Sequence, residues 1–343
     1  MPTRNDGRKS VFKKSDESLV GKEAVKGYNF DDGLDFKKYL ESLSSTGFQA
    51  TNLGKAIKLV RKMREENCVI FLGITSNIVS SGLREAITFL VKHKLVHYIV
   101  TTTGAVEEDV IKTHAPFYIG SFDADGAKLR GKGINRTGNL FVPNERYIWF
   151  EKFMQPLLKK MFEEQRQGGK SENGGKQVKI IDSVEFVKRM GMQMHEQGLA
   201  NTQESFVYWA HNNNIPVFCP ALCDGSLGDM IYFFKKEHPE FKIDLSDEIV
   251  KMNDAALLAE KTGAIIVGGS VPKHHIMNAN MLREGADYTV YINTAIEEDG
   301  SDSGARPEEA KSWGKAAPND NSVKVWGEAT LVLPLLIAGA FVD

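Results

Sequence analysis

The sequence predicts an α/β fold, a doubly wound and mostly parallel sheet with helices on both faces. Three observations predict it. Short, continuously apolar runs of strand length alternate with longer segments of helical period. The runs lack the alternation of apolar and polar residues, which is typical of strands buried on both faces of a parallel sheet. Small, hydroxyl-bearing and acidic residues gather directly after the runs, where ligands bind in such sheets.

The alternation extends over most of the chain. The predicted strands are Cys68–Gly73, Tyr98–Thr102, Pro216–Cys219, Ala264–Gly268, Tyr288–Asn293 and Val323–Trp326. The segments of helical period that follow them are Gly82–His93, Val106–Thr113, Leu227–Lys236, His274–Glu284 and Ala329–Ala338. Because crossovers between parallel strands are right-handed, this order of elements gives a Rossmann-like sheet.

Length and charge limit the classes of protein to which the chain can belong. The 343 residues suffice for one large domain or two ordinary ones. With 43 basic against 45 acidic side chains, there is no electrostatic reason to expect nucleic acid or an anionic membrane as a partner. No apolar run approaches the roughly 20 residues that span a bilayer, and Met1–Glu17 lacks the apolar core of a signal peptide. We expect a cytoplasmic protein with reduced thiols at Cys68, Cys219 and Cys223, and no metal site.

Two stretches lie outside the periodic pattern. Residues 1–26 are poor in periodic apolar residues, which predicts a flexible N-terminal tail. Residues 163–177 hold four glycines among charged side chains, which predicts an exposed loop. The remainder, residues 27–343, is predicted to form a single domain.

The segments after the strands favour a nucleotide ligand. Small residues ahead of a helix let backbone amides approach a phosphate, and the helix dipole favours its negative charge. Tight turns and helix caps would explain any one of these segments, but they explain five in succession less well. No G-x-G-x-x-G motif is present, so this pattern alone does not name the nucleotide.

Carboxylates are a second group of candidate site residues. Those at or just beyond predicted strand ends are Glu107, Glu108, Asp224, Asp229, Asp302 and Glu309. Converging carboxylates need counter-charge, which a metal ion, Lys or Arg side chains, or a polycationic ligand could provide. Taken singly, each acid is better explained as a helix cap or a solvated side chain. As a group they favour a cationic substrate.

A lysine and two histidines are the candidate chemical groups. Lys315 ends the segment Ser312-Trp313-Gly314-Lys315, where an aromatic wall could desolvate its amine and make it a nucleophile toward an imine carbon. A solvated surface lysine is the ordinary alternative. The pair His274 and His275 follows Lys273 and offers a base near neutral pH, although a structural histidine is the commoner role.

Several segments together resemble one enzyme family, deoxyhypusine synthase. The resemblance runs from about residue 20 to the C-terminus. It is carried by Val25–Phe30, Thr46–Asn52, Thr75–Asn77, Gly104–Asp109, Ala221–Asp229, Lys273–His275, Gly300–Pro307 and Ser312–Lys315. The last two, Gly-Ser-Asp-Ser-Gly-Ala-Arg-Pro and Ser-Trp-Gly-Lys, are its most specific motifs. The resemblance implies a Rossmann-type fold, a homotetramer built as a dimer of dimers, and active sites between two subunits.

The resemblance also implies the reaction. NAD accepts hydride from spermidine to give an imine, and 1,3-diaminopropane leaves. The butylimine passes to the enzyme lysine and then to a lysine of the eukaryotic initiation factor 5A precursor. The stored hydride finally returns, which gives deoxyhypusine. Residues 27–343 would then be an NAD-binding catalytic domain, and the N-terminal tail could cover the mouth of the active site.

Individual residues match the family's functional positions. Lys315 matches the nucleophile, and His274 is the candidate base. The positions that match the NAD site are Ser76, Asn77, Ser80, Thr102, Thr103, Gly104, Glu108, Asp224, Gly269, Thr294, Ala295, Glu328 and Ala329. The positions that match the polyamine site are Glu107, Glu108, Asp229, His274, Gly300, Ser301, Asp302, Glu309 and Trp313, with the tryptophan as a wall against the methylene chain.

The chain also departs from the family pattern. Glu328 stands where the family usually has Asp, Cys223 where Thr is common, and Ser270 where a third Gly is common. We expect the longer Glu328 side chain to alter the affinity for NAD without abolishing binding. Homospermidine synthase, which hands the aminobutyl group to putrescine, shares the chemical residues and stays open as an alternative. An inactive regulatory paralogue, a plain dehydrogenase and a metal-dependent hydrolase fit the residues less well.

Overall fold

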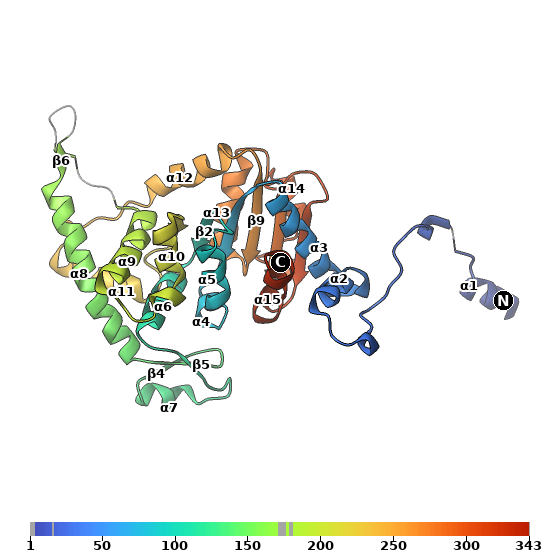
Figure 1. Ribbon diagram of the computed structural model, residues 1–343, viewed down its shortest axis with the longest axis horizontal. Helices are drawn as coiled ribbons and strands as arrows, with labels where there is room; N and C mark the ends of the chain where they lie inside the picture. The colour runs from blue at the N-terminus through green and yellow to red at the C-terminus, as the bar shows by residue number, and fades with distance from the viewer. Residues whose placement is uncertain (1–3, 16, 171–175, 178–180, 343) are drawn as a thin grey trace.

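A six-stranded parallel sheet forms the centre of the protein, and its spatial order is β11-β10-β9-β1-β2-β8 (Figure 1). The computed structural model describes residues 4–15, 17–170, 176–177 and 181–342. The strands are Val69–Ile74 (β1), Tyr98–Thr101 (β2), Val217–Phe218 (β8), Thr262–Val267 (β9), Tyr288–Asn293 (β10) and Ser322–Trp326 (β11). All the predicted strands are present, so the predicted parallel α/β sheet is confirmed.

The chain winds outward from β1 in both directions. It first adds β2 and β8 on one side of β1, and it then returns to add β9, β10 and β11 on the other side. Val69 to Ile74 pair in parallel with residues 262–267 of β9, and Phe71 to Ile74 pair with residues 98–101 of β2. The point where the strand order reverses therefore lies between β1 and β9, and a ligand crevice is expected at the carboxyl end of these strands.

Helices cover both faces because each strand is apolar on both. In β1, Ile70, Leu72 and Ile74 belong to one apolar core, whereas Phe71 belongs to the second. This is the two-residue period of a strand. Helices that contribute to the larger core include α2 (Phe36–Thr46), α3 (Phe48–Glu65), α5 (Arg84–Lys92), α6 (Thr103–His114), α11 (Ser226–Glu237) and α15 (Ala329–Ala340). The smaller core lies under α12 (Ser246–Leu257) and α13 (Ser270–Met281).

Further elements add a helical layer around α6 that the periodic pattern did not predict. They are α4 (Ser76–Ser80), α8 (Glu145–Gln167), α9 (Ser183–Gln197) and α10 (Phe206–Asn213). The short helix α14 (Pro307–Ser312) was not predicted either and lies at the other end of the sheet, beside β11. A small antiparallel sheet of β3 (Tyr118–Ile119), β5 (Leu140–Pro143) and β4 (Ile134–Thr137) lies beside α7 (Gly126–Gly131) (Figure 1). Among the described residues, no helix is long and apolar enough to cross a membrane.

The exposed loop predicted at 163–177 is wrong in its first part. Helix α8 continues through Gln167 and ends at Gly168, which has a φ of 60°. Gln165 is buried and donates a hydrogen bond to the Lys242 carbonyl at 2.7 Å, so a tertiary contact keeps this segment helical. Beyond it, β6 (Gly169–Lys170) pairs with β7 (Lys176–Gln177). Residues 171–175 lie outside the described residues.

The N-terminal tail contains a short helix, α1 (Arg4–Val11), whose residues are all exposed. Figure 1 shows α1 apart from the body of the protein. Near the predicted boundary, the chain first joins α2, because the Lys26 amide donates to the Ser45 carbonyl at 3.0 Å and the Ser45 hydroxyl donates to the Lys26 carbonyl at 2.8 Å. The flexibility of the tail and its covering role stay predictions.

Candidate active site

The predicted site residues lie along one edge of the sheet. All six strands are parallel, so the segments that follow them emerge at the same edge. Helices α4, α6, α11, α13 and α15 begin there, and so do the segments 293–306 and 219–225. The candidate residues taken from the sequence pattern therefore follow strands that all end at one edge of the sheet.

A pocket of about 350 Å³ opens beside the end of β10 and contains both candidate catalytic residues. It is lined by Lys273, His274, Met277, Gly300, Asp302, Ala305, Arg306, Glu309, Ala310, Trp313 and Lys315. Of the predicted polyamine positions, His274, Gly300, Asp302, Glu309 and Trp313 line this pocket together with Lys315. Ser301 is exposed and does not line it. We refer to this space as the Lys315 pocket.

The backbone holds Lys315 at the end of α14. Gly314 has a φ of 69°, a conformation that favours glycine, and this turn lets the Lys315 amide donate to the Ala310 carbonyl at 2.9 Å. The Lys315 carbonyl in turn accepts from the Ala286 amide at 3.1 Å. The Lys315 ammonium lies 5.6 Å from the centroid of the Trp313 ring. Trp313 is 64% exposed. The aromatic neighbour predicted for Lys315 is thus present, on the open side of the pocket.

His274 is oriented by two polar neighbours. Its Nδ1 lies 3.6 Å from Oδ1 of Asp302, and its Nε2 shares a 2.8 Å hydrogen bond with the Asn278 side-chain amide. The second carboxylate oxygen of Asp302 is buried and has no hydrogen-bond partner among the described residues. Such an acceptor is costly unless a donor reaches it, so the pocket is prepared for a cationic group. His275, the other candidate base, is buried, and burial lowers its pKa to about 4.

Lys273 lines the pocket, and the buried Tyr291 lies next to it. The Lys273 ammonium lies 4.8 Å from the centroid of the Tyr291 ring and donates to the carbonyls of Asp302 and Ala305. Burial lowers the pKa of Lys273, and the charge of Asp302 opposes that effect. The hydroxyl of Tyr291 is buried without a hydrogen-bond partner in the described part of the chain.

Sequence reasoning missed Tyr291 and Asn278 as site residues. Asn278 was detectable in principle, because it stands four residues after His274 on the same helix and therefore on the same face. Tyr291 stood inside the apolar run of β10, where only its hydroxyl distinguished it from its neighbours.

Three of the predicted polyamine carboxylates lie elsewhere. Glu107 and Glu108 are on α6 after β2, and Asp229 is on α11 after β8, so none of them lines the Lys315 pocket. Figure 1 shows α6 and α11 on the opposite side of the sheet from α14. Within one chain, the single polyamine site predicted from the sequence is therefore divided into two groups. The sequence could not reveal this, because strand order and not chain order sets the separation.

Glu107 and Glu108 are both buried. Oε2 of Glu107 accepts a hydrogen bond from the Leu227 amide at 2.7 Å and so holds the amino end of α11. Burial raises the pKa of Glu107. Burial also raises the pKa of Glu108 to about 7, although a hydrogen bond from the Ser80 hydroxyl acts in the opposite direction. A carboxyl group with such a pKa can change its protonation state near neutral pH.

The predicted cofactor positions include two close backbone approaches. A side chain at Gly104 would place its Cβ 2.7 Å from the Ser76 hydroxyl, which itself bonds the Thr102 hydroxyl at 2.5 Å. A Cβ at Gly269 would lie 2.2 Å from the Ser303 hydroxyl. These glycines let the Ser76 and Ser303 side chains pack against the starts of α6 and α13, where a side chain would clash.

The other cofactor positions stand at the same edge. Thr103 donates to the Ala221 carbonyl at 2.5 Å, and Asp224 is exposed. Thr294 and Ala295 follow β10, and Ala329 begins α15. Glu328, expected to face a ribose hydroxyl, caps α15 instead: its Oε2 accepts from the amides of Thr330 at 2.9 Å and Leu331 at 3.3 Å. Only its second oxygen remains for a ligand.

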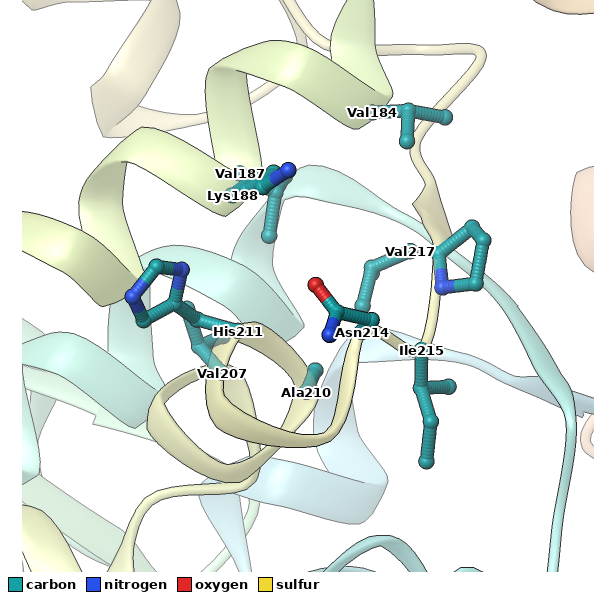
Figure 2. A pocket seen from close by; sticks show the side chains of 10 residues that line it. Val184, Val187, Lys188, Val207, Ala210, His211, Asn214, Ile215 and Val217 are labelled. Carbon is teal, nitrogen blue, oxygen red and sulfur yellow. The ribbon is translucent and has the colours of Figure 1, made fainter.

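A further pocket lies away from this edge. It measures about 130 Å³ and is enclosed by α9, α10 and the amino end of β8 (Figure 2). Its walls are mainly apolar, and Lys188, His211 and Asn214 add polar groups. No predicted site residue lines it, and it stands at the sheet edge opposite to the helix amino ends. We therefore assign the chemistry to the Lys315 pocket and its neighbours.

Comparison with known proteins decides the family. The sequence profile of deoxyhypusine synthase matches residues 38–340. The chain belongs to the deoxyhypusine synthase family. The resemblance seen in the sequence is confirmed, and this deoxyhypusine synthase family member is an enzyme of the transferase class.

Individual relatives of this deoxyhypusine synthase family member cover nearly the whole chain. A deoxyhypusine synthase from Senecio vernalis is 47% identical, and the alignment covers 97% of this chain and 93% of the relative. A homospermidine synthase from Senecio vulgaris is 46% identical, and the alignment covers 98% of this chain and 94% of the relative. A crystal structure from Entamoeba histolytica, provisionally assigned as deoxyhypusine synthase, superposes with a TM-score of 0.63 at 31% identity, covering 92% of this chain and 96% of that one.

Proposed function

We propose that the protein is an NAD-dependent deoxyhypusine synthase. It transfers the 4-aminobutyl group of spermidine, through an imine on Lys315, to a specific lysine of the eukaryotic initiation factor 5A precursor. The observation that carries this proposal is the Lys315 pocket, where an amine beside an aromatic ring shares one space with the side chains of His274, Asp302 and Glu309. A family match at nearly full length supports it.

The pocket suits an alkyl diammonium chain. Asp302 and Glu309 supply negative charge for an ammonium group, and the unpaired oxygen of Asp302 accepts its hydrogen bond. Trp313 and Met277 offer apolar surface to the methylene groups between the charges. Lys315 attacks the imine carbon, and the nitrogen of the departing amine takes up a proton. His274, held by Asp302 and Asn278, moves that proton.

NAD would bind along the edge between the two groups of carboxylates. The amino ends of α4, α6 and α13 lie at this edge, and helix dipoles there favour the negative charge of a pyrophosphate. Ser76, Asn77 and Thr102 would hold the cofactor beside β1 and β2, and Asp224 and Glu328 would flank it. When bound, NAD accepts a hydride from spermidine and later returns it.

We infer that each active site forms between two subunits of a homotetramer. One chain would supply the Lys315 pocket, and a neighbouring chain would supply Glu107, Glu108 and Asp229. The separation of these groups within a single chain supports this arrangement. A closed assembly with twofold symmetry repeats such a composite site at each equivalent interface.

The acceptor decides between two functions that share this chemistry. Homospermidine synthases are as similar to this chain as deoxyhypusine synthases are, so the acceptor has to be tested directly. The test is incubation of the purified chain with NAD and spermidine, and with either the factor 5A precursor or putrescine. We expect the precursor to gain one aminobutyl group by mass spectrometry. A product formed only with putrescine would identify a homospermidine synthase instead.

A further inference from the structure

One loop separates the Lys315 pocket from a second cavity. The segment 295–305 connects the end of β10 to α14 and contributes Gly300, Asp302 and Ala305 to the Lys315 pocket. On its other side lies a cavity of about 590 Å³, bounded by residues of α3, β11 and the loop itself, including Lys324. Arg306 lines both spaces. The loop is thus a single layer of chain, and it needs lateral support.

Lys324 supplies this support from the side of the second cavity. The side chain leaves β11, and its ammonium donates to the Ala295 carbonyl at 2.9 Å and to the Gly304 carbonyl at 2.5 Å. These carbonyls stand near the two ends of the loop, so one cation closes it. The ends approach closely, because a Cβ at Gly304 would lie 1.9 Å from the Ile296 carbonyl oxygen.

Lys273 supports the same loop from the opposite side. Its ammonium bonds the carbonyls of Asp302 and Ala305, so the two lysines together engage four backbone oxygens of the loop. Hydrogen bonds from a charged donor are stronger than neutral ones. Lys273 is hydrogen-bonded to the Asp302 backbone, so it holds the part of the loop that carries the Asp302 side chain.

Neutral hydrogen bonds also hold the loop, including one from the Ser270 amide to the Ser303 hydroxyl at 2.9 Å and others within its turn. The ion pair between Arg306 and Glu297, at 2.8 Å, has both side chains largely exposed, and exposed pairs contribute little. The loop also contains Gly300, with a φ of 68°, and a serine-rich turn, so its backbone has much conformational freedom to lose.

We propose that Lys324 is a positioning residue for the transfer reaction, because it closes the loop 295–305 against β11 and thereby holds Asp302 in the wall of the Lys315 pocket. The proposal rests on the proposed function for its kinetic consequence. The closure of the loop itself does not depend on activity. Lys324 is absent from the set of site residues assigned above, and it acts on the reaction only through the loop.

The test compares three variants. Lys324→Met removes the ammonium and keeps the side-chain length, Lys324→Arg keeps charge and donors, and Lys261→Met is the matched control. Lys261 pairs with Glu66 at 2.8 Å near the amino end of β9, away from the site. The measurements are the spermidine KM, the Kd for NAD, and hydrogen–deuterium exchange of peptides that span residues 295–305.

We expect Lys324→Met to raise the spermidine KM about tenfold and the Kd for NAD by no more than about threefold, with faster exchange in 295–305. Lys324→Arg should restore the KM to within about threefold of the original enzyme, and Lys261→Met should change neither quantity. If the unaltered enzyme transfers no aminobutyl group, the proposed function fails, while the exchange comparison still tests the loop.

Three results would overturn the proposal. The first is an unchanged spermidine KM despite faster exchange, which would mean that the loop need not be held for substrate to bind. The second is unchanged exchange in Lys324→Met. The third is a chain that fails to fold in both Lys324→Met and Lys324→Arg, which would assign Lys324 to overall stability.

Discussion

Oδ1 of Asp302 lies 3.6 Å from Nδ1 of His274, while the other oxygen of the same carboxylate is buried without a partner in the described structure. The first relationship orients a ring that can move a proton. The second leaves a buried acceptor without a protein donor among the described residues. Asp302 is thus connected to both roles proposed for the Lys315 pocket, substrate binding and proton transfer.

Replacing Asp302 by Asn should therefore weaken spermidine binding. The substitution keeps the shape of the side chain but removes the charge, and a hydrogen bond to a charged group contributes about 1.5–3 kcal/mol. We expect the spermidine KM to rise about 10- to 100-fold, with little change in the Kd for NAD. Binding of both ligands can be measured by titration calorimetry. A larger loss for NAD than for spermidine would reverse the partition of substrate and cofactor residues.

Replacing Lys315 by Arg should abolish transfer to the acceptor protein. The guanidinium keeps the positive charge but is not a nucleophile, whereas NAD binding should be largely retained. Borohydride reduction in the presence of spermidine and NAD should fix an aminobutyl group on the original enzyme, and peptide mass spectrometry should locate it on Lys315. Lys273 is the matched control, because its ammonium is committed to two carbonyls. Finding the fragment on Lys273 would show that the nucleophile is misassigned.

Mixing two inactive variants should restore activity if the site spans two subunits. Lys315→Arg disables the Lys315 pocket, and Asp229→Ala disables the carboxylate group on α6 and α11. An oligomer built from either variant alone should therefore be poorly active. After random reassembly about half of the subunit pairs are mixed, and one of the two sites in each mixed pair is intact. About a quarter of the original activity should therefore return. Reassembled mixtures that stay as inactive as the separate variants would place the complete site within one chain.

Replacing Glu108 by Gln should stabilise the protein at high pH only. Burial raises the pKa of Glu108 from 4.5 to about 7. Between these values the unfolded chain loses a proton that the folded chain keeps, so the contribution of this carboxyl to stability falls as pH rises, by about 3 kcal/mol at most. Gln does not titrate, so it removes this fall in stability, and its side-chain oxygen still accepts a hydrogen bond from Ser80. Urea unfolding should give equal stability near pH 4 and a more stable variant at pH 8. Equal stability at both pH values would contradict the burial argument.

Replacing Ser270 by Gly should stabilise the start of α13. Ser270 has a φ of 53°, a left-handed conformation that costs a residue with a side chain roughly 1–2 kcal/mol. This is the position where the family commonly has glycine. We expect a gain of about 1 kcal/mol in the free energy of unfolding, since the greater freedom of glycine in the unfolded chain offsets part of the relief. Ser270→Ala is the control, and an equal gain from alanine would implicate the hydroxyl and not the backbone.

Much of the fold follows from local pattern. Buried parallel strands are apolar on both faces, so their runs are visible without any knowledge of their neighbours. The six strands of the central sheet and the helices α5, α6, α11, α13 and α15 were predicted for this reason. The helices α2, α3, α8, α9 and α12 were not predicted, because their apolar residues are mixed with charged ones and the cores they contact are set by distant segments. The same holds for Gln165, whose contact with Lys242 extends α8 into a glycine-rich stretch.

The sequence by itself determined the parallel sheet, the edge where the candidate site residues follow the strands, and a lysine next to an aromatic ring, because each depends on residues close together in the chain. Only the tertiary structure decided which candidates share a pocket. Glu107 bonds an amide 120 residues away, and Lys324 bonds carbonyls 20 and 29 residues before it. Such contacts depend on strand order, which the spacing of residues along one chain does not specify.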